Sequence, residues 1–385
     1  MSIKLPQTEA ERNTWIKFHK LADLTVHDDI KLASASTIKE QQYLALRVLW
    51  KTHKSKDLDV EKFDLKIWIS KADELLRSFQ SWQGYRQSFK TSIIPEGTFA
   101  LARKYQKQAA LSTDETLRPS VSISPISQRT RSQISSLTKR LRDAQLQTPT
   151  KSRGDPLDYF KIEGEEKEED ENDEDENEET PFVSPGPSEI VNLMYPPTKD
   201  EQIVNTALVN FLNALTMHFP AANDWTLHRK SFKADFQKAS FEARTDGYLE
   251  DHSDPDKARA LIEVKPIMRN KKRDRICMQE AAQMAAWIKT DPDLHGCLNK
   301  PGRRLHISQD RHQLFIIIAE YSQDYIDYLN KKPPVGSALP FLTMHEYGAW
   351  DTSILREMDS IARIILAIAL RAHSDCRGAS KLTDK

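Results

Sequence analysis

Apolar residues recur three and four positions apart along the first part of the chain, from about residue 8 to residue 110. The segments 37–53 and 62–79 show this spacing most clearly, and it is typical of helices that bury one face. Trp15, Trp50 and Trp68 fall in this part at positions that suit a core better than a ligand platform. We therefore predict a helical N-terminal region over residues 1–111 and assign it no chemistry.

Hydrophobic order returns at about residue 188, now with strand and helix patterns alternating. This order predicts an α/β domain over residues 188–375, followed by a short tail, 376–385. The expected helices are 198–219, 275–290 and 352–373, and the expected strands are 240–250, 258–268, 303–308 and 313–322.

The stretch between these two regions, residues 112–187, is rich in Ser, Thr, Pro and charged residues. Few large apolar side chains are present to offset the entropy of ordering it, so we expect a disordered linker. Its first half is basic around Arg140 and Arg142, which suits a nuclear address or a nucleic-acid contact, although short basic clusters also arise by chance. Its second half contains an acidic run, and protein partners are expected there and on the helical region.

The net charge of the chain becomes informative only when the acidic run is counted separately. The 385-residue chain carries a formal net charge of -1, but residues 163–179 hold 13 acidic residues and one lysine, which leaves +11 on the remainder. That excess would attract polyanions, and dispersed surface lysines would give the same sum. The sequence contains neither an 18-residue apolar run nor the hydrophobic core of a signal peptide. We therefore expect neither a membrane span nor secretion.

Cysteine usage is sparse and indicates a reducing compartment. Cys277, Cys297 and Cys376 lack the short spacing of a zinc site or a disulfide framework. We expect a nuclear protein, with the cytoplasm as the alternative.

Two opposite charges interrupt the apolar strand expected at 258–268. Residues two apart on a strand share a face, so Glu263 and Lys265 stand side by side while Ile262 and Val264 point the other way. The preceding strand contains Asp246, and turn-forming residues separate the two strands. If they form a hairpin, two carboxylates and a lysine converge; otherwise Glu263 and Lys265 form an ordinary ion pair.

Such a trio has a chemical logic for phosphodiester hydrolysis. Mg²⁺ prefers oxygen ligands and keeps several waters, so one or two carboxylates suffice to hold it against a phosphate. The ion activates a bound water, and an adjacent ammonium orients that water or stabilises the developing charge.

With these residues the chain resembles the PD-(D/E)xK nuclease superfamily over about residues 195–370, and it is similar to nuclease-like domains of fungal proteins. Asp246, Glu263 and Lys265 match the signature, except that Thr245 replaces its proline. The resemblance implies a restriction-endonuclease-like mixed sheet flanked by helices, with Mg²⁺ (or Mn²⁺) on Asp246 and Glu263 and with Lys265 assisting the water. It also implies DNA as the substrate, and a homodimer because many such nucleases pair.

Further residues around the trio each have two interpretations. Glu201 matches the extra acid that many members carry on the first helix, but with Thr198 it also forms a capping-box pattern. Gln279 and Gln283 lie four apart on the next helix, where related nucleases use a glutamine to position water or substrate, and they equally suit an exposed helix face.

The turn after the strand is basic and gives the candidate nucleic-acid contacts. It is either a solvated loop or a set of phosphate contacts beside the metal. Its members are Arg269, Lys271, Lys272, Arg273 and Arg275.

The sequence thus supports two functions from different classes. The first is a Mg²⁺-dependent nuclease, and the second is a non-catalytic nucleic-acid-binding or chromatin-associated adaptor that retains the nuclease fold. Geometry discriminates between the two: for the nuclease, Asp246, Glu263 and Lys265 should converge on an open cleft, and side chains that point into different environments would exclude it.

Overall fold

A computed structural model describes most of the chain outside its central segment. The described residues are 5–21, 24–28, 31–91, 93–111, 198, 200–219, 223–251, 254–292, 302–332 and 340–383. Those on either side of the central segment belong to one compact unit, spanning 1–115 and 188–385. The linker expected at 112–187, with Arg140, Arg142 and the acidic run, lies outside the described residues.

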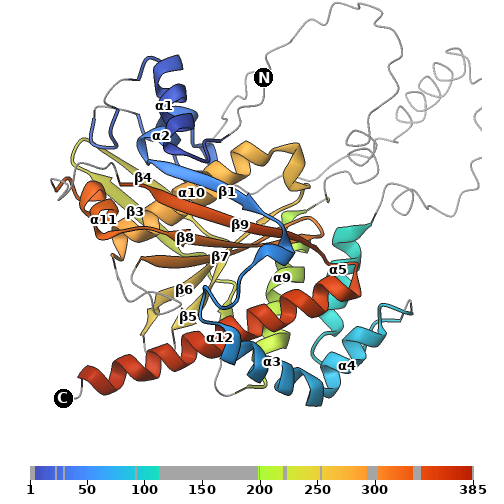
Figure 1. Cartoon of the computed structure of the whole chain (residues 1–385). Helices are drawn as coiled ribbons and strands as arrows, with labels where there is room; N and C mark the ends of the chain where they lie inside the picture. Colours follow the sequence, from blue (N-terminus) through green and yellow to red (C-terminus); the bar gives the residue numbers. More distant parts are fainter. Residues whose placement is uncertain are drawn as a thin grey trace, which may run out of the picture. The chain divides into compact units, whose positions relative to one another are not determined.

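A mixed seven-stranded sheet forms the centre of this unit (Figure 1). Its order is β1-β9-β8-β7-β6-β5-β2, with β1 parallel to β9 and β6 parallel to β7, while the other neighbours are antiparallel. The strands are β1 (Val48–His53), β2 (Trp225–Thr226), β5 (Gly247–Asp251), β6 (Asp254–Lys265), β7 (Arg303–Asp310), β8 (Gln313–Glu320) and β9 (Leu342–Asp351). Two further strands, β3 (Ser231–Phe236) and β4 (Ala239–Arg244), pair as a separate antiparallel ribbon.

Helices cover both faces of the sheet. On one face lie α3 (Lys66–Ser78), α4 (Gln80–Gln87), α5 (Ala100–Ala110), α9 (Glu201–Thr216) and α12 (Leu355–Thr383). On the other lie α2 (Glu40–Ala45), α10 (Arg273–Thr290) and α11 (Gln323–Leu329), together with the β3–β4 ribbon. The remaining elements are α1 (Glu9–Phe18) and the 3₁₀ turns η1 (Ala35–Thr37), η2 (Ser55–Asp57) and η3 (Arg269–Lys271).

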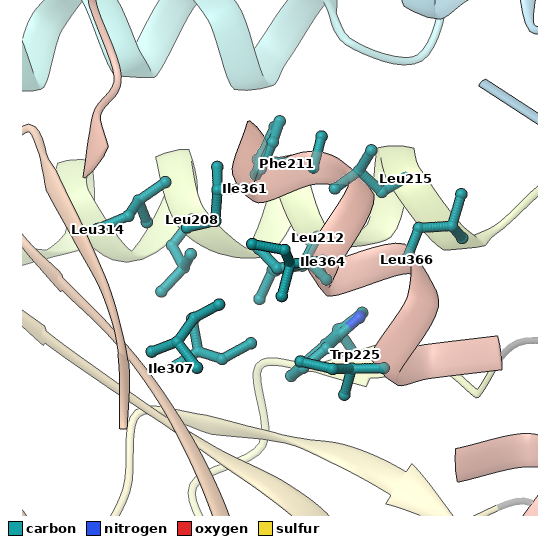
Figure 2. Close-up of a cluster of buried hydrophobic side chains, with 14 of the residues drawn as sticks. Leu208, Phe211, Leu212, Leu215, Trp225, Ile307, Leu314, Ile361, Ile364 and Leu366 are labelled. Carbon is teal, nitrogen blue, oxygen red and sulfur yellow. The ribbon is translucent and has the colours of Figure 1, made fainter. Parts of the chain in front are cut away.

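The larger hydrophobic core joins segments that are far apart in the sequence. Figure 2 shows Leu208, Phe211 and Leu212 of α9 gathered with Ile361 of α12 and with Ile307 of the sheet. The same cluster includes apolar residues of α3, α4 and α5 from the N-terminal region. Burial of these faces on both sides of the sheet provides the main stabilisation and makes the sheet a fixed platform for the side chains at its strand ends.

The structure confirms the predicted α/β class, with a mixed sheet flanked by helices. It also shows that the N-terminal region is not purely helical, because the helix expected over 37–53 ends at Ala45. Arg47 adopts a left-handed conformation (φ 53°), and the chain then continues as β1, which pairs with β9. That part of the helix prediction is wrong because the sheet edge offers Val48, Leu49 and Trp50 a partner that local periodicity does not reveal.

The strand expected at 240–250 is divided in two by Thr245 and Asp246, so that β4 belongs to the ribbon and β5 to the main sheet. Within the described residues, no helix combines the length and the apolar character needed to cross a membrane.

Candidate metal centre

A hairpin brings the two signature acids together. β5 and β6 pair antiparallel with Gly247 opposite Ile262, so Asp246 lies beside Glu263. The backbone amide of Asp246 donates to the carbonyl of Ile262 at 3.0 Å, and the Asp246 Oδ2 atom accepts from the amide of Val264 at 3.1 Å. These bonds hold the Asp246 carboxylate where β5 begins and β6 ends, as the hairpin prediction requires.

A third carboxylate comes from the first residue of α9. The N-cap of this helix is Asp200, whose side chain accepts from the amide of Gln202 at 2.8 Å. The capping-box interpretation of Thr198 and Glu201 is therefore wrong, because Asp200 already fills the capping role. Glu201 instead reaches Lys265, with its Oε1 atom 3.5 Å from the ammonium nitrogen.

Glu201, Asp246 and Glu263 form one carboxylate cluster. An oxygen from each lies within 4.8 Å of the other two, and Asp246 and Glu263 are buried while Glu201 is partly exposed. Lys265 closes the group, with its Nζ atom 2.5 Å from Glu263 Oε1. Glu263 and Lys265 therefore share a face of β6, as their spacing predicts, and both signature acids and the lysine meet at one point.

Two glutamines of α10 complete the surroundings of Glu263. The Gln279 side-chain amide donates to Glu263 Oε1, and Gln283 Nε2 donates to Glu263 Oε2 at 2.6 Å. Gln283 also donates to the carbonyl of Arg244 at 2.7 Å. Both glutamines thus face the cluster and not solvent, and they fix the orientation of the Glu263 carboxyl group.

Burial and neighbouring charges shift the pKa values of Glu263 and Lys265. Burial, with a smaller effect from the negative charge of Asp246, outweighs the opposing effect of Lys265 and raises the pKa of Glu263 to about 8. For Lys265, burial lowers the pKa, but Glu263 and Glu201 outweigh it and leave the pKa above its usual value.

The donor set fits a hard divalent cation. Three carboxylates supply oxygen atoms only, which Mg²⁺ and Mn²⁺ accept. Ligands on opposite sides of one Mg²⁺ lie about 4.2 Å apart, which is compatible with oxygens that all lie within 4.8 Å of one another. Among the described residues this is the one group of three or more acidic, His or Cys side chains placed to share an ion.

The basic turn differs from its predicted role at two positions. Arg269 is 1% exposed, so its assignment as a nucleic-acid contact is wrong. Its guanidinium bonds Asp310 at 2.5 Å, Glu280 at 2.5 Å and Glu346 at 2.8 Å. Arg273 also donates to Glu346, at 2.8 Å. Arg269 and Arg273 therefore both belong to an ionic network with buried acids.

The other basic residues of the turn remain open to solvent. Lys272 and Arg275 are exposed and Lys271 is partly exposed. Burial and the nearby charge of Arg311 lower the pKa of Lys271. The assignment of these three residues as phosphate contacts stays a prediction.

One cation beside the cluster was not predicted. Arg229, in the loop between β2 and β3, places its Nη2 atom 3.4 Å from Asp246 Oδ1. Its side chain is 58% exposed and can move toward a ligand. No local pattern indicates such a role, because Arg229 reaches the site only through the pairing of β2 with β5.

Comparisons with protein-family models, curated proteins and solved structures found no match to this chain. The resemblance to the PD-(D/E)xK nucleases therefore stays a prediction.

Proposed function

We propose that the protein is a metal-dependent nuclease of the PD-(D/E)xK type that hydrolyses phosphodiester bonds in DNA. The observation that carries the proposal is the convergence of Asp246, Glu263 and Lys265 with Glu201 at the ends of β5 and β6. Distant parts of the chain supply these groups, so an isolated ion pair does not account for their meeting.

Each side chain has a distinct part in this proposal. Asp246, Glu263 and Glu201 would hold the cation, and Gln279 and Gln283 fix the orientation of the Glu263 carboxyl group. A bound Mg²⁺ lowers the pKa of a water and neutralises charge on the phosphate oxygens. Lys265 donates a hydrogen bond to the attacking water or to the phosphate oxygen on which charge grows. Arg229 offers a second cation to the phosphate.

A second candidate function follows from the hydrogen bonding of Glu263. Both of its oxygens already accept bonds from Lys265, Gln279 or Gln283, an arrangement that is complete without an ion. A chain that has retained the fold while losing the reaction would keep such a network. This observation favours a non-catalytic nucleic-acid-binding adaptor.

The deciding experiment is cleavage of duplex, single-stranded and branched DNA and of RNA by the purified chain in Mg²⁺, Mn²⁺ or EDTA. We expect cutting that requires the metal and that Lys265→Ala reduces by 10²-fold or more, roughly the contribution of one electrostatic group to a transition state. Lys71→Ala, an exposed lysine on α3, is the matched control and should cut normally.

Equal cutting by wild type and Lys265→Ala would point to a contaminant. DNA binding without cutting in any metal would favour the adaptor.

A further inference from the structure

The β3–β4 ribbon presents a polar face beside the metal centre. Along β3, exposed and buried residues alternate strictly, and the buried Phe232, Ala234 and Phe236 belong to the core cluster that also contains α10. Phe241 and Ala243 of β4 join them. The opposite face of the ribbon is therefore free to meet a ligand while the inner face anchors it.

Three cross-strand pairs make up this outer face. Ser231 lies opposite Arg244, Lys233 opposite Glu242, and Asp235 opposite Ser240. Donors and acceptors are mixed: Arg244 and Ser231 each donate to Glu242 at 2.6 Å, and Lys233 lies 3.8 Å from Asp235. These charged side chains are largely exposed, and such surface pairs open at little cost when a ligand binds. A face that bound only phosphates would be expected to carry cations alone, whereas this one offers both partners of a hydrogen bond.

The ribbon is tied to the candidate centre at its Arg244 end. The Arg244 carbonyl accepts from Gln283, the side chain that also holds Glu263, and Asp246 follows two residues later. A pocket of about 140 Å³ opens there, lined by Ser34, Ala35, Ser36, Glu242, Arg244 and Gln279. Gln279 donates to Glu263, so one wall of the pocket belongs to the centre and another to the N-terminal η1 turn.

We propose that the outer face of the β3–β4 ribbon reads base edges in the major groove of duplex DNA next to the bond that the centre cuts. The B-form major groove is about 12 Å wide and admits a two-stranded ribbon. Arginine pairs with guanine, a carboxylate accepts from cytosine, and serine accepts or donates. This inference rests on the proposed nucleic-acid substrate and narrows it to duplex DNA, because the major groove of A-form RNA is too narrow for side chains.

Selection from a pool of duplex DNA with a randomised central block tests this inference without requiring cleavage. The full chain binds the pool in EDTA, and the bound duplexes are sequenced for wild type, Arg244→Gln and Glu242→Gln. Arg77→Gln, an exposed arginine on α3, is the matched control.

We expect wild type to enrich particular bases at neighbouring positions. Arg244→Gln should lower the preference at one of them by about 5-fold or more, the effect of losing one specific base contact. Glu242→Gln should lower it at a nearby position, and Arg77→Gln should leave the profile unchanged. Melting temperatures within a few degrees of wild type would show that the variants remain folded.

Several outcomes overturn the inference. They are the absence of DNA binding, binding without base enrichment, enrichment that Arg244→Gln leaves intact, or a loss of affinity that is equal for all sequences, which would make Arg244 a phosphate contact. Base enrichment without metal-dependent cleavage would refute the nuclease while leaving the ribbon's role standing.

Discussion

Glu263 is the residue on which the candidate centre depends most. With its pKa raised to about 8 by burial, it holds a proton over much of the neutral range in the metal-free chain. A cation that binds there must displace that proton, so binding and deprotonation are coupled. The same side chain is costly to the fold when charged and useful to the proposed function only when charged.

Replacing Glu263 with glutamine separates these two effects. Glu263→Gln keeps the size and hydrogen bonding of the protonated carboxyl group, so we expect a melting temperature in EDTA equal to or above that of wild type. The variant should lose the upward shift in melting temperature that Mn²⁺ gives wild type by binding the folded state. Differential scanning fluorimetry across a Mn²⁺ titration measures both, and a retained Mn²⁺ shift would place the ion elsewhere.

His306 gives the fold a dependence on pH. The side chain is fully buried on β7, its ring nitrogens have no hydrogen-bond partner among the described residues, and burial, with Arg269 and Lys265, lowers its pKa to about 3. The unfolded chain, with an ordinary histidine pKa of about 6.5, takes up a proton as the pH falls below that value, and the folded chain does not. The contribution of neutral His306 to the unfolding free energy is therefore fully present well above pH 6.5 and decreases as the pH falls toward 3.

We expect wild type to lose about 1.6 kcal/mol more of its unfolding free energy between pH 6.5 and pH 5 than His306→Leu loses, since one pH unit is worth about 1.4 kcal/mol for a full proton and the unfolded histidine is half protonated at pH 6.5. Urea unfolding at the two pH values measures the difference. Parallel losses in both proteins would mean that other groups control the acid response.

The site was predictable from the sequence to the extent that it depends on strand periodicity. The two-residue spacing of Glu263 and Lys265 and the turn before them sufficed to bring in Asp246. Glu201 had a competing local interpretation as part of a capping box, which only the position of Asp200 removes. Arg269, expected to contact nucleic acid, is buried, and Arg229, which was not predicted, lies beside the cluster, because long-range packing determines both positions.

At the scale of elements, the buried network around Arg269 connects four parts of the fold. Its acids come from α10 (Glu280), β7 (Asp310) and β9 (Glu346), and Trp50 of β1 donates to Glu346 at 3.0 Å. Ser308 of β7 donates to Glu280 at 2.5 Å. One guanidinium thus links the helix that carries the glutamines to three strands of the sheet.

Removing that guanidinium leaves three buried acids without their shared cation. We expect Arg269→Met to lower the unfolding free energy by about 3–5 kcal/mol, the usual cost of breaking a buried ion pair on one side. Lys272→Met, exposed three residues away, should change it by less than about 0.5 kcal/mol. Urea titrations of the two variants give the comparison, and equal stabilities would show that the acids become neutral without cost.

Elements with strong internal patterns were predictable, whereas those defined by a distant partner were not. The helices at 201–216 and 273–290 and the apolar strand at 313–320 follow from their own residues. β1 follows a segment of helical periodicity and exists because β9 lies beside it. The single strand expected at 240–250 is interrupted at Thr245 and Asp246, where the chain passes from the ribbon to the main sheet.

For the whole molecule, the N-terminal and C-terminal segments share one core. Phe211 of α9 is fully buried, with its ring 5.9 Å from that of Tyr85 and 6.2 Å from that of Phe99 between centroids. Tyr85 and Phe99 belong to the N-terminal region, so this cluster crosses the central segment of the sequence. The region first expected to stand apart is an integral part of the structure.

We expect Phe211→Ala to lower the unfolding free energy by about 3–5 kcal/mol, as large-to-small changes in aromatic cores do. Loss of the ring should destabilise both segments in a single transition. Tryptophan fluorescence and far-ultraviolet circular dichroism in the same urea titration measure this, and separate midpoints would indicate that the segments unfold independently.

The pairing of β1 with β9 has a consequence for synthesis of the chain. Val48 pairs with Leu342, so the first strand of the sheet leaves the ribosome nearly 300 residues before its neighbour. At a translation rate of about 5–20 residues per second, that interval is about 15–60 s. Throughout it, Val48, Leu49 and Trp50 lack the strand with which they will pair, so this apolar segment stays unpaired for a defined interval of synthesis.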